Sequence, residues 1–209
     1  MRNGILKGII GVIITANIIN VSNTIQANNT EDLNTNKTVA VQEIKETNKA
    51  QDKLLKDTLP DSEVERFKEV EIVLLEDGKQ LEKEYSERGF EGIEENLYNG
   101  FYSYWDMLLV VEADGKEEHT FKHEVGHFID MTEDEAGNNI IFKYSGSKEF
   151  KDIYSKEKNK LFDDDNAYFR DDISEYFAEA YAMYVDNYYY KDKAPLTYNY
   201  IQNVKLGII

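Results

Sequence analysis

The feature that most constrains the fold of this 209-residue chain is the motif His-Glu-Val-Gly-His at residues 123–127. Residues four apart on an α-helix lie almost above one another, so His123 and His127 can reach one metal ion at about 2.0–2.1 Å. Glu124 then lies beside a water bound to that ion, where a general base is needed. The motif therefore predicts a helix that carries part of a catalytic zinc site.

The residues around the motif predict that this helix packs against a core. Phe121, Val125 and Phe128 are spaced i, i+4 and i+7, so they form one apolar face, with Ile129 beside it. The alternative is a surface helix with two histidines and a solvated glutamate. A surface helix of that kind would not need an apolar face.

A catalytic zinc ion usually has three protein ligands and a water, so two histidines require a third ligand from elsewhere. The chain has no cysteine, which leaves histidine and carboxylate as ligands. His119 fails on geometry because it lies eight residues from His127, about 12 Å along the helix axis. We expect His119 to be a spare residue or to lie on the substrate side.

The best candidates for the third ligand lie on a second predicted helix at residues 174–184, which combines small and aromatic residues. Glu175 and Glu179 share one face of it, and carboxylates on an apolar helix need buried partners. A zinc ion and a ligating imidazole would be such partners. The alternative makes Glu175 part of a helix cap after Asp172 and leaves Glu179 solvated. Two further glutamates stay open as ligands: Glu149 and Glu157.

The chain is predicted to have three parts. Residues 1–27 contain two basic residues, an apolar stretch and then small and polar residues, as is typical of a secretory signal peptide; a single membrane anchor is the alternative. Residues 28–45 are rich in Asn, Thr and acidic residues and are expected to form a flexible leader. Residues 46–209 suit one domain. We expect a secreted, extracellular protein without stable membrane association after signal cleavage.

Two strands are predicted ahead of the zinc helix, at residues 70–75 and 107–111, because each apolar run is followed by Asp-Gly. Ser62 and Glu65 fit a capping box at the start of a short helix. The second strand directly precedes the zinc helix, so we expect it to offer the sheet edge that holds an extended substrate. The aromatic residues of 98–105 either line subsites or pack in the core.

The net charge of −17 at pH 7 makes nucleic acid an improbable partner. Such an acidic balance is typical of a soluble surface, and it also favours the approach of basic substrates.

Taken together, these motifs resemble the catalytic domain of the anthrax lethal factor family, and most closely the small secreted Pro-Pro endopeptidases. In that family the second helix reads E-F-F-A-E-[AS]-F, and a tyrosine stands seven residues before its first glutamate. Here Tyr168 stands seven residues before Glu175. The resemblance runs from about residue 46 to the C-terminus, and its motifs are these: G-F-E-G at 89–92, the motif at 123–127, Asp130, E-Y-F-A-E-A-Y at 175–181 and A-P-L-T-Y at 194–198.

The resemblance agrees with an α+β, zincin-like fold in which a small twisted sheet packs on the zinc helix and on a second ligand-bearing helix. It implies peptide-bond hydrolysis by a zinc-activated water, with Glu124 as general base and Tyr168 supporting the oxyanion. It also implies one Zn2+ per chain and a glutamate that orients a zinc histidine. The implied ligands are His123, His127 and Glu175, and the orienting residue is Glu179.

The chain departs from the Pro-Pro endopeptidases at residues 98–105, where those proteins carry a Gly-Gly element ahead of the substrate strand. We expect a monomer that cuts extracellular proteins or peptides, with proline-rich sites among its targets. The alternative function is that of a catalytically silent zincin-fold binding protein or toxin component. Cleavage of proline-containing peptides that a chelator abolishes would distinguish the two.

Overall fold

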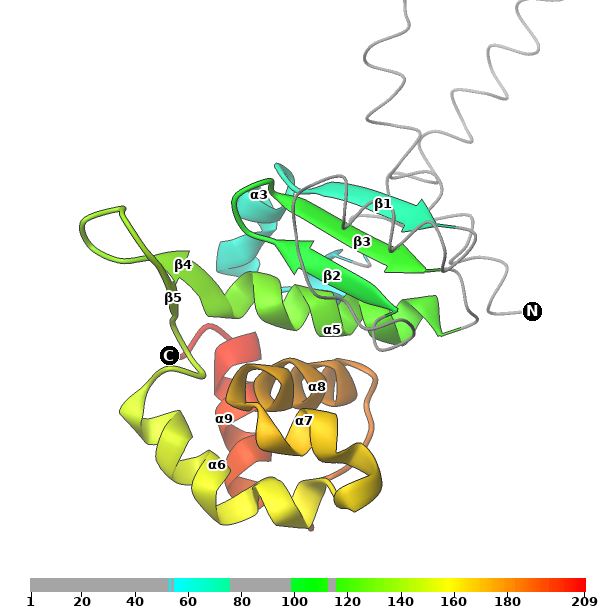
Figure 1. Ribbon diagram of the computed structural model, residues 1–209, viewed down its shortest axis with the longest axis vertical. Helices are drawn as coiled ribbons and strands as arrows, with labels where there is room; N and C mark the ends of the chain where they lie inside the picture. Colours follow the sequence, from blue (N-terminus) through cyan, green and yellow to red (C-terminus); the bar gives the residue numbers. More distant parts are fainter. Residues whose placement is uncertain (1–52, 54, 76–98, 113–115) are drawn as a thin grey trace, which may run out of the picture. The chain divides into compact units, whose positions relative to one another are not determined.

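The computed structural model describes residues 53, 55–75, 99–112 and 116–209 (Figure 1). The chain divides into two units, Met1–Asp57 and Thr58–Ile209, and the second is described here by itself. The predicted signal peptide, the leader and the Gly-Phe-Glu-Gly segment lie outside the described residues. None of the described helices is both long and apolar enough to cross a membrane.

A three-stranded sheet forms one layer of the second unit. The parallel pair is β1 (Glu71–Leu75) and β3 (Leu108–Glu112), and β2 (Gly100–Ser103) pairs antiparallel with the other side of β3. Both predicted strands are confirmed, each beginning one residue later than expected. The sequence of β3 is apolar on both faces because the strand is central, and residues 108–111 are fully buried.

The expectation that the strand before the zinc helix offers a sheet edge is wrong. Both sides of β3 are paired, and among the described strands β1 and β2 lie at the two edges of the sheet, with β2 packed against the zinc helix. The Glu112 N–H donates to the Asn99 carbonyl, so Asn99 and Glu112 form a hydrogen-bonded pair. In an antiparallel ladder such pairs alternate with non-hydrogen-bonded ones, so Phe101 bonds to β3 and its two neighbours do not. The backbone polar groups of Gly100 and Tyr102 therefore point away from β3.

Helix α5 (Glu117–Asp130) carries the His-Glu-x-x-His motif, as predicted, and lies between the sheet and the C-terminal helices (Figure 1). Residues 121–130 are all buried, which excludes the alternative of a surface helix. The predicted second helix is α8 (Ile173–Val185). The fold is the expected α+β type. Its other elements are α3 (Val64–Phe67), β4 (Met131–Glu133), β5 (Ile140–Phe142), α6 (Lys148–Leu161), α7 (Ala167–Asp171), α9 (Pro195–Lys205) and the 3-10 turns Asp61–Glu63 and Asp164–Asn166.

The capping box predicted at Ser62 and Glu65 is not formed. Pro60 already starts a 3-10 turn, in which the Glu63 N–H donates to the Pro60 carbonyl, so Ser62 lies inside the turn. Helix α3 begins after Glu63 without a side-chain cap. Phe67 is nevertheless buried, because its ring packs edge-on against that of Phe128 at 4.9 Å.

The buried Glu157 of α6 caps α9 rather than facing the histidines. Its carboxylate accepts hydrogen bonds from the Leu196 N–H at 3.1 Å, the Thr197 N–H at 2.8 Å and the Thr197 hydroxyl at 2.9 Å. These donors at a helix N-terminus satisfy a buried charge. Glu149 is exposed in the first turn of α6. Neither residue belongs to the group of possible metal ligands described next.

Candidate metal centre and active site

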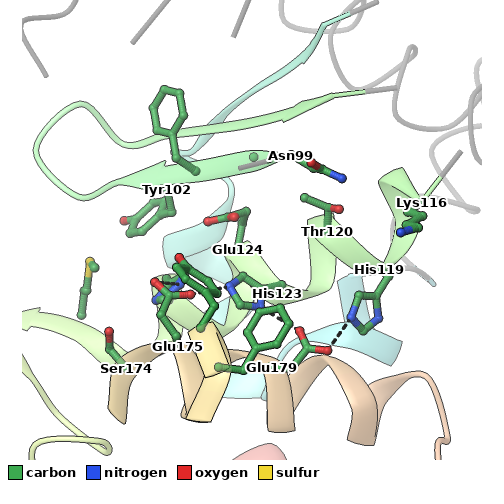
Figure 2. A pocket seen from close by; sticks show the side chains of 16 residues that line it. Asn99, Tyr102, Lys116, His119, Thr120, His123, Glu124, Ser174, Glu175 and Glu179 are labelled. Atoms are coloured by element: carbon green, nitrogen blue, oxygen red, sulfur yellow. Dashed lines mark hydrogen bonds and ion pairs between the residues drawn. The ribbon is translucent and has the colours of Figure 1, made fainter. Parts of the chain in front are cut away.

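Three side chains from two helices converge on one point. The Nε2 atom of His123 lies 3.1 Å from one oxygen of Glu175 (Figure 2). Nε2 of His127 lies 3.4 Å from the other oxygen. All three candidate ligand atoms lie within 4.8 Å of one another. Tetrahedral ligands that bind zinc at 2.0–2.1 Å are separated by about 3.3 Å. Two nitrogens and one carboxylate at this spacing fit a zinc ion.

Glu175 reaches the histidines because another residue caps α8. The Asp172 side chain accepts hydrogen bonds from the backbone N–H groups of Ser174 at 2.7 Å and Glu175 at 3.1 Å. The Glu175 carboxylate is therefore not part of the helix cap. The alternative in which it caps the helix after Asp172 is wrong. Burial opposes its ionised form, but the hydrogen bonds with His123 and His127 outweigh burial and lower the pKa of Glu175. The group is an anion, as a zinc ligand must be.

Gly126 brings the two ligand-bearing helices together. A Cβ atom at this position would lie 2.7 Å from Cα and 3.1 Å from Cβ of Ala178 on α8. Such contacts are too short for any side chain, so only glycine permits this approach. The Gly126–Ala178 contact thereby sets how far Glu175 lies from the histidines of α5.

Glu124 lies on the side of α5 that faces the sheet edge. It is buried, and burial raises the pKa of its carboxyl group, while a hydrogen bond from the Tyr102 backbone lowers it. A Cβ at Gly100 would lie 2.8 Å from the Thr120 methyl and 3.3 Å from a Glu124 oxygen. Gly100 therefore lets the open edge of β2 lie directly against the motif (Figure 2).

Glu179 contacts two imidazoles rather than solvent. One oxygen lies 3.0 Å from Nδ1 of His123, and the other lies 3.0 Å from Nε2 of His119. Burial opposes ionisation, but these hydrogen bonds outweigh it and lower the pKa of Glu179 to about 2. The arrangement occupies Nδ1 of His123 and directs Nε2 towards Glu175, where a metal would bind, as in carboxylate–histidine–zinc contacts generally.

His119 is neither a spare residue nor a metal ligand. Its second ring nitrogen, Nδ1, lies 2.6 Å from a carboxylate oxygen of Asp186. The hydrogen bond with Asp186, followed by that with Glu179, raises the pKa of His119 to about 9. Asp186 had no place in the sequence prediction, although it follows Glu179 by seven residues and so continues the same face just past the end of α8.

Tyr168 on α7 lines the same cavity, which has a volume of about 570 Å³. Its side chain is partly exposed, and its ring contacts that of Phe169 at 5.2 Å. The Phe169 ring lies 5.6 Å from that of His123, a contact that sequence reasoning missed. The cavity extends along α5 from Lys116, just before the helix, to Met131, just after it.

This fold and these side chains define a zincin-like protein: an α+β domain in which a His-Glu-x-x-His helix and a glutamate-bearing helix meet beside a sheet edge. The sequence model of the family described as anthrax toxin lethal factor, N- and C-terminal domain, matches residues 24–204, and the chain belongs to this family. The family expected from the motifs is thereby confirmed.

A solved structure, that of the Pro-Pro endopeptidase PPEP-2 from Paenibacillus alvei, is similar to this chain. The sequence identity is 25% and the TM-score is 0.50. The similarity covers 70% of this chain and 85% of that chain. A search of curated protein sequences found no match.

Proposed function

We propose that this chain is a secreted zinc metalloendopeptidase that hydrolyses peptide bonds of extracellular proteins at Pro-Pro sites. The observation that carries the proposal is the convergence of two imidazole nitrogens and the Glu175 carboxylate beside the buried Glu124. Membership of the lethal factor family and the similarity to a Pro-Pro endopeptidase support it. The apolar segment within residues 1–27 supports secretion.

His123, His127 and Glu175 would hold the zinc ion, which supplies an acidified water and polarises the scissile carbonyl. Glu124 faces the same cavity, and a buried carboxylate with a raised pKa is suited to take up a proton and then donate it to the leaving amine. The Tyr168 hydroxyl would donate a hydrogen bond to the negative oxygen that forms on the substrate.

The open edge of β2 would hold the substrate backbone. The outward-pointing backbone groups of Gly100 and the carbonyl of Tyr102, whose N–H donates to Glu124, would offer hydrogen bonds to an extended peptide, and alternate side chains of that peptide would enter the cavity. An extended peptide also suits Pro-Pro sites, because proline fixes φ near −65° and disfavours helix in the residue before it.

The test is cleavage of a synthetic peptide library that contains Pro-Pro sequences together with matched Pro-Ala and Ala-Pro controls. We expect the zinc-loaded protein to cut between the two prolines, and we expect a chelator to abolish cleavage and added zinc to restore it. Mass spectrometry of the products gives the cleavage site. Glu124→Gln is the control variant, expected to bind zinc without turnover.

Cleavage at other sequences only would retain the peptidase and refute the Pro-Pro target. Zinc binding without cleavage of any peptide would instead favour a silent zincin-fold binding protein. Turnover by Glu124→Gln at the wild-type rate would remove Glu124 from the reaction.

A further inference from the structure

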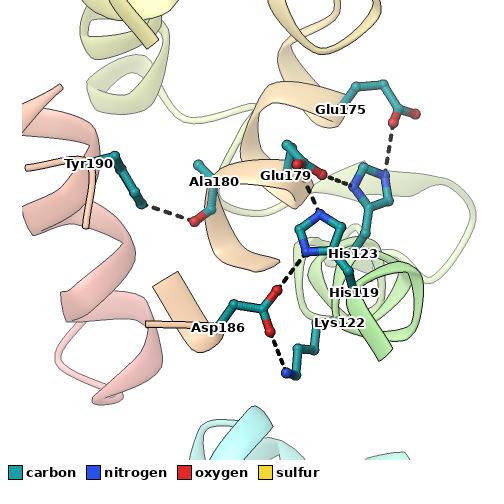
Figure 3. A network of polar contacts seen from close by, with 8 residues as sticks. All are labelled: His119, Lys122, His123, Glu175, Glu179, Ala180, Asp186 and Tyr190. Atoms are coloured by element: carbon teal, nitrogen blue, oxygen red, sulfur yellow. Dashed lines mark hydrogen bonds and ion pairs between the residues drawn. The ribbon is translucent and has the colours of Figure 1, made fainter. Parts of the chain in front are cut away.

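A line of four side chains connects the end of α8 to the candidate zinc site (Figure 3). Asp186 contacts Nδ1 of His119 at 2.6 Å, and Nε2 of His119 contacts Glu179 at 3.0 Å. The second oxygen of Glu179 contacts Nδ1 of His123 at 3.0 Å. His123 then directs Nε2 towards Glu175 at 3.1 Å. The contacts alternate between α8 and α5, so the line ties the two helices together.

His119, like His123, has a carboxylate at each ring nitrogen, but neither of the two carboxylates beside His119 is a candidate metal ligand. An ionised carboxylate accepts hydrogen bonds and cannot donate them, so a ring that bonds to two of them must donate from both nitrogens. His119 is therefore a cation between Glu179 and Asp186, and charge-assisted hydrogen bonds of this kind are roughly twice as strong as neutral ones.

The far end of the line is fixed. Asp186 ends α8, and its second oxygen accepts a hydrogen bond from the ammonium group of Lys122, which is buried and also bonds to Glu118 at 2.7 Å. Asp186 thus holds His119 in one orientation from a position outside the cavity lining. Both oxygens of Glu179 are then occupied by imidazoles, which leaves that carboxylate a single orientation.

We propose that His119 is a positioning residue for the metal centre: it locks Glu179, and through Glu179 it orients the His123 ring so that Nε2 faces the metal. The inference rests on the proposed zinc site and adds to it the residue behind Glu179. Glu179 alone offers the histidine an acceptor, but a carboxylate held at one oxygen only is free to rotate about its last bond. The effect on zinc passes entirely through Glu179.

The test is zinc affinity, measured by competition with a chromophoric chelator. Loss of a residue that supports a metal ligand typically weakens binding 10–100-fold. We expect this range for Glu179→Gln and about 10-fold for His119→Phe, which acts from one step farther away. Since His119 acts through Glu179, the double variant should bind zinc no more weakly than Glu179→Gln alone. Glu157→Gln is the matched control, a buried glutamate that bonds to the N-terminus of α9 instead, and should bind zinc like the wild type.

Two further measurements separate positioning from loss of folding. The visible spectrum of the cobalt-substituted protein should change in His119→Phe and stay unchanged in Glu157→Gln. His119→Gln, whose amide still donates to one carboxylate, should lose less affinity than His119→Phe, and it serves if the phenylalanine variant does not fold.

Each result points to one conclusion. Wild-type affinity in both His119 variants, or additive losses in the double variant, would overturn the role of His119 and leave the zinc site standing. A wild-type protein that binds no zinc would overturn the proposed function and the positioning role together.

Discussion

Gly126→Ala tests whether the contact between α5 and α8 sets the geometry of the site. The added methyl group would lie 2.7 Å from Cα of Ala178, whereas carbon atoms pack at about 3.5 Å or more. Relieving the contact requires the helices to separate by about 0.8 Å at this point. Zinc sites hold their distances within about 0.2 Å, so a shift of this size displaces Glu175 from the histidines.

The magnitude follows from two opposing effects. Alanine in place of glycine favours a helix by about 0.8–1.0 kcal/mol, whereas overpacking a tight core costs about 1–3 kcal/mol. We expect the variant to be up to about 2 kcal/mol less stable than the wild type in the metal-free state. Adding Ala178→Gly should not restore stability fully, because the nearest atom is the backbone Cα rather than the Ala178 methyl group.

The assay combines urea unfolding of the metal-free protein with zinc affinity by chelator competition. We expect the Gly126→Ala variant to lose zinc affinity even where it remains folded, because the ligands come from both helices. If the variant is about 1 kcal/mol more stable than the wild type and binds zinc equally well, only the higher helix propensity of alanine acts. That result would refute the argument that Gly126 and Ala178 are too close for a side chain.

Three further predictions concern other parts of the domain. Tyr168→Phe should lose about 2.7–4 kcal/mol of transition-state stabilisation in kcat while zinc stays bound, and an unchanged rate would assign Tyr168 to packing. Glu157→Gln should lower the free energy of unfolding by about 1–3 kcal/mol in urea titrations, since it weakens the α9 cap. The pKa of His119 rises from 6.5 to about 9 on folding, so its contribution to the stability of the metal-free protein is complete below pH 6.5 and is lost as pH rises through 9. In thermal unfolding, the difference in Tm between the wild type and His119→Phe should therefore shrink as pH rises over that range. A difference in Tm that does not change with pH would contradict this.

The parts of the site that lie on single helices could be predicted from the sequence. The spacing of His123 and His127 defines a face without reference to the rest of the fold, and so does that of Glu175 and Glu179. The need of buried carboxylates for partners then indicated that the two faces meet. The structure brings these residues together as expected.

The sheet edge and the support of Glu179 depend on contacts between distant segments. β2 has four residues, too few for a clear alternating pattern, and its place beside β3 is decided by pairing between strands. His119 was excluded as a ligand by its distance to His127, which the structure bears out, and was expected to be a spare or substrate-side residue without a partner. Its contact with Asp186 requires the helix approach at Gly126, which helical spacing alone does not reveal. The β4–β5 hairpin, α6 and α9 were not predicted either.

The most direct test of the zinc site is anomalous diffraction at the zinc absorption edge from crystals of the zinc-loaded protein. The account predicts one strong peak per chain, about 2.0–2.1 Å from Nε2 of His123 and of His127 and about 2.0–2.2 Å from an oxygen of Glu175. A crystal without bound zinc, or a peak that Glu175 does not contact, would contradict it.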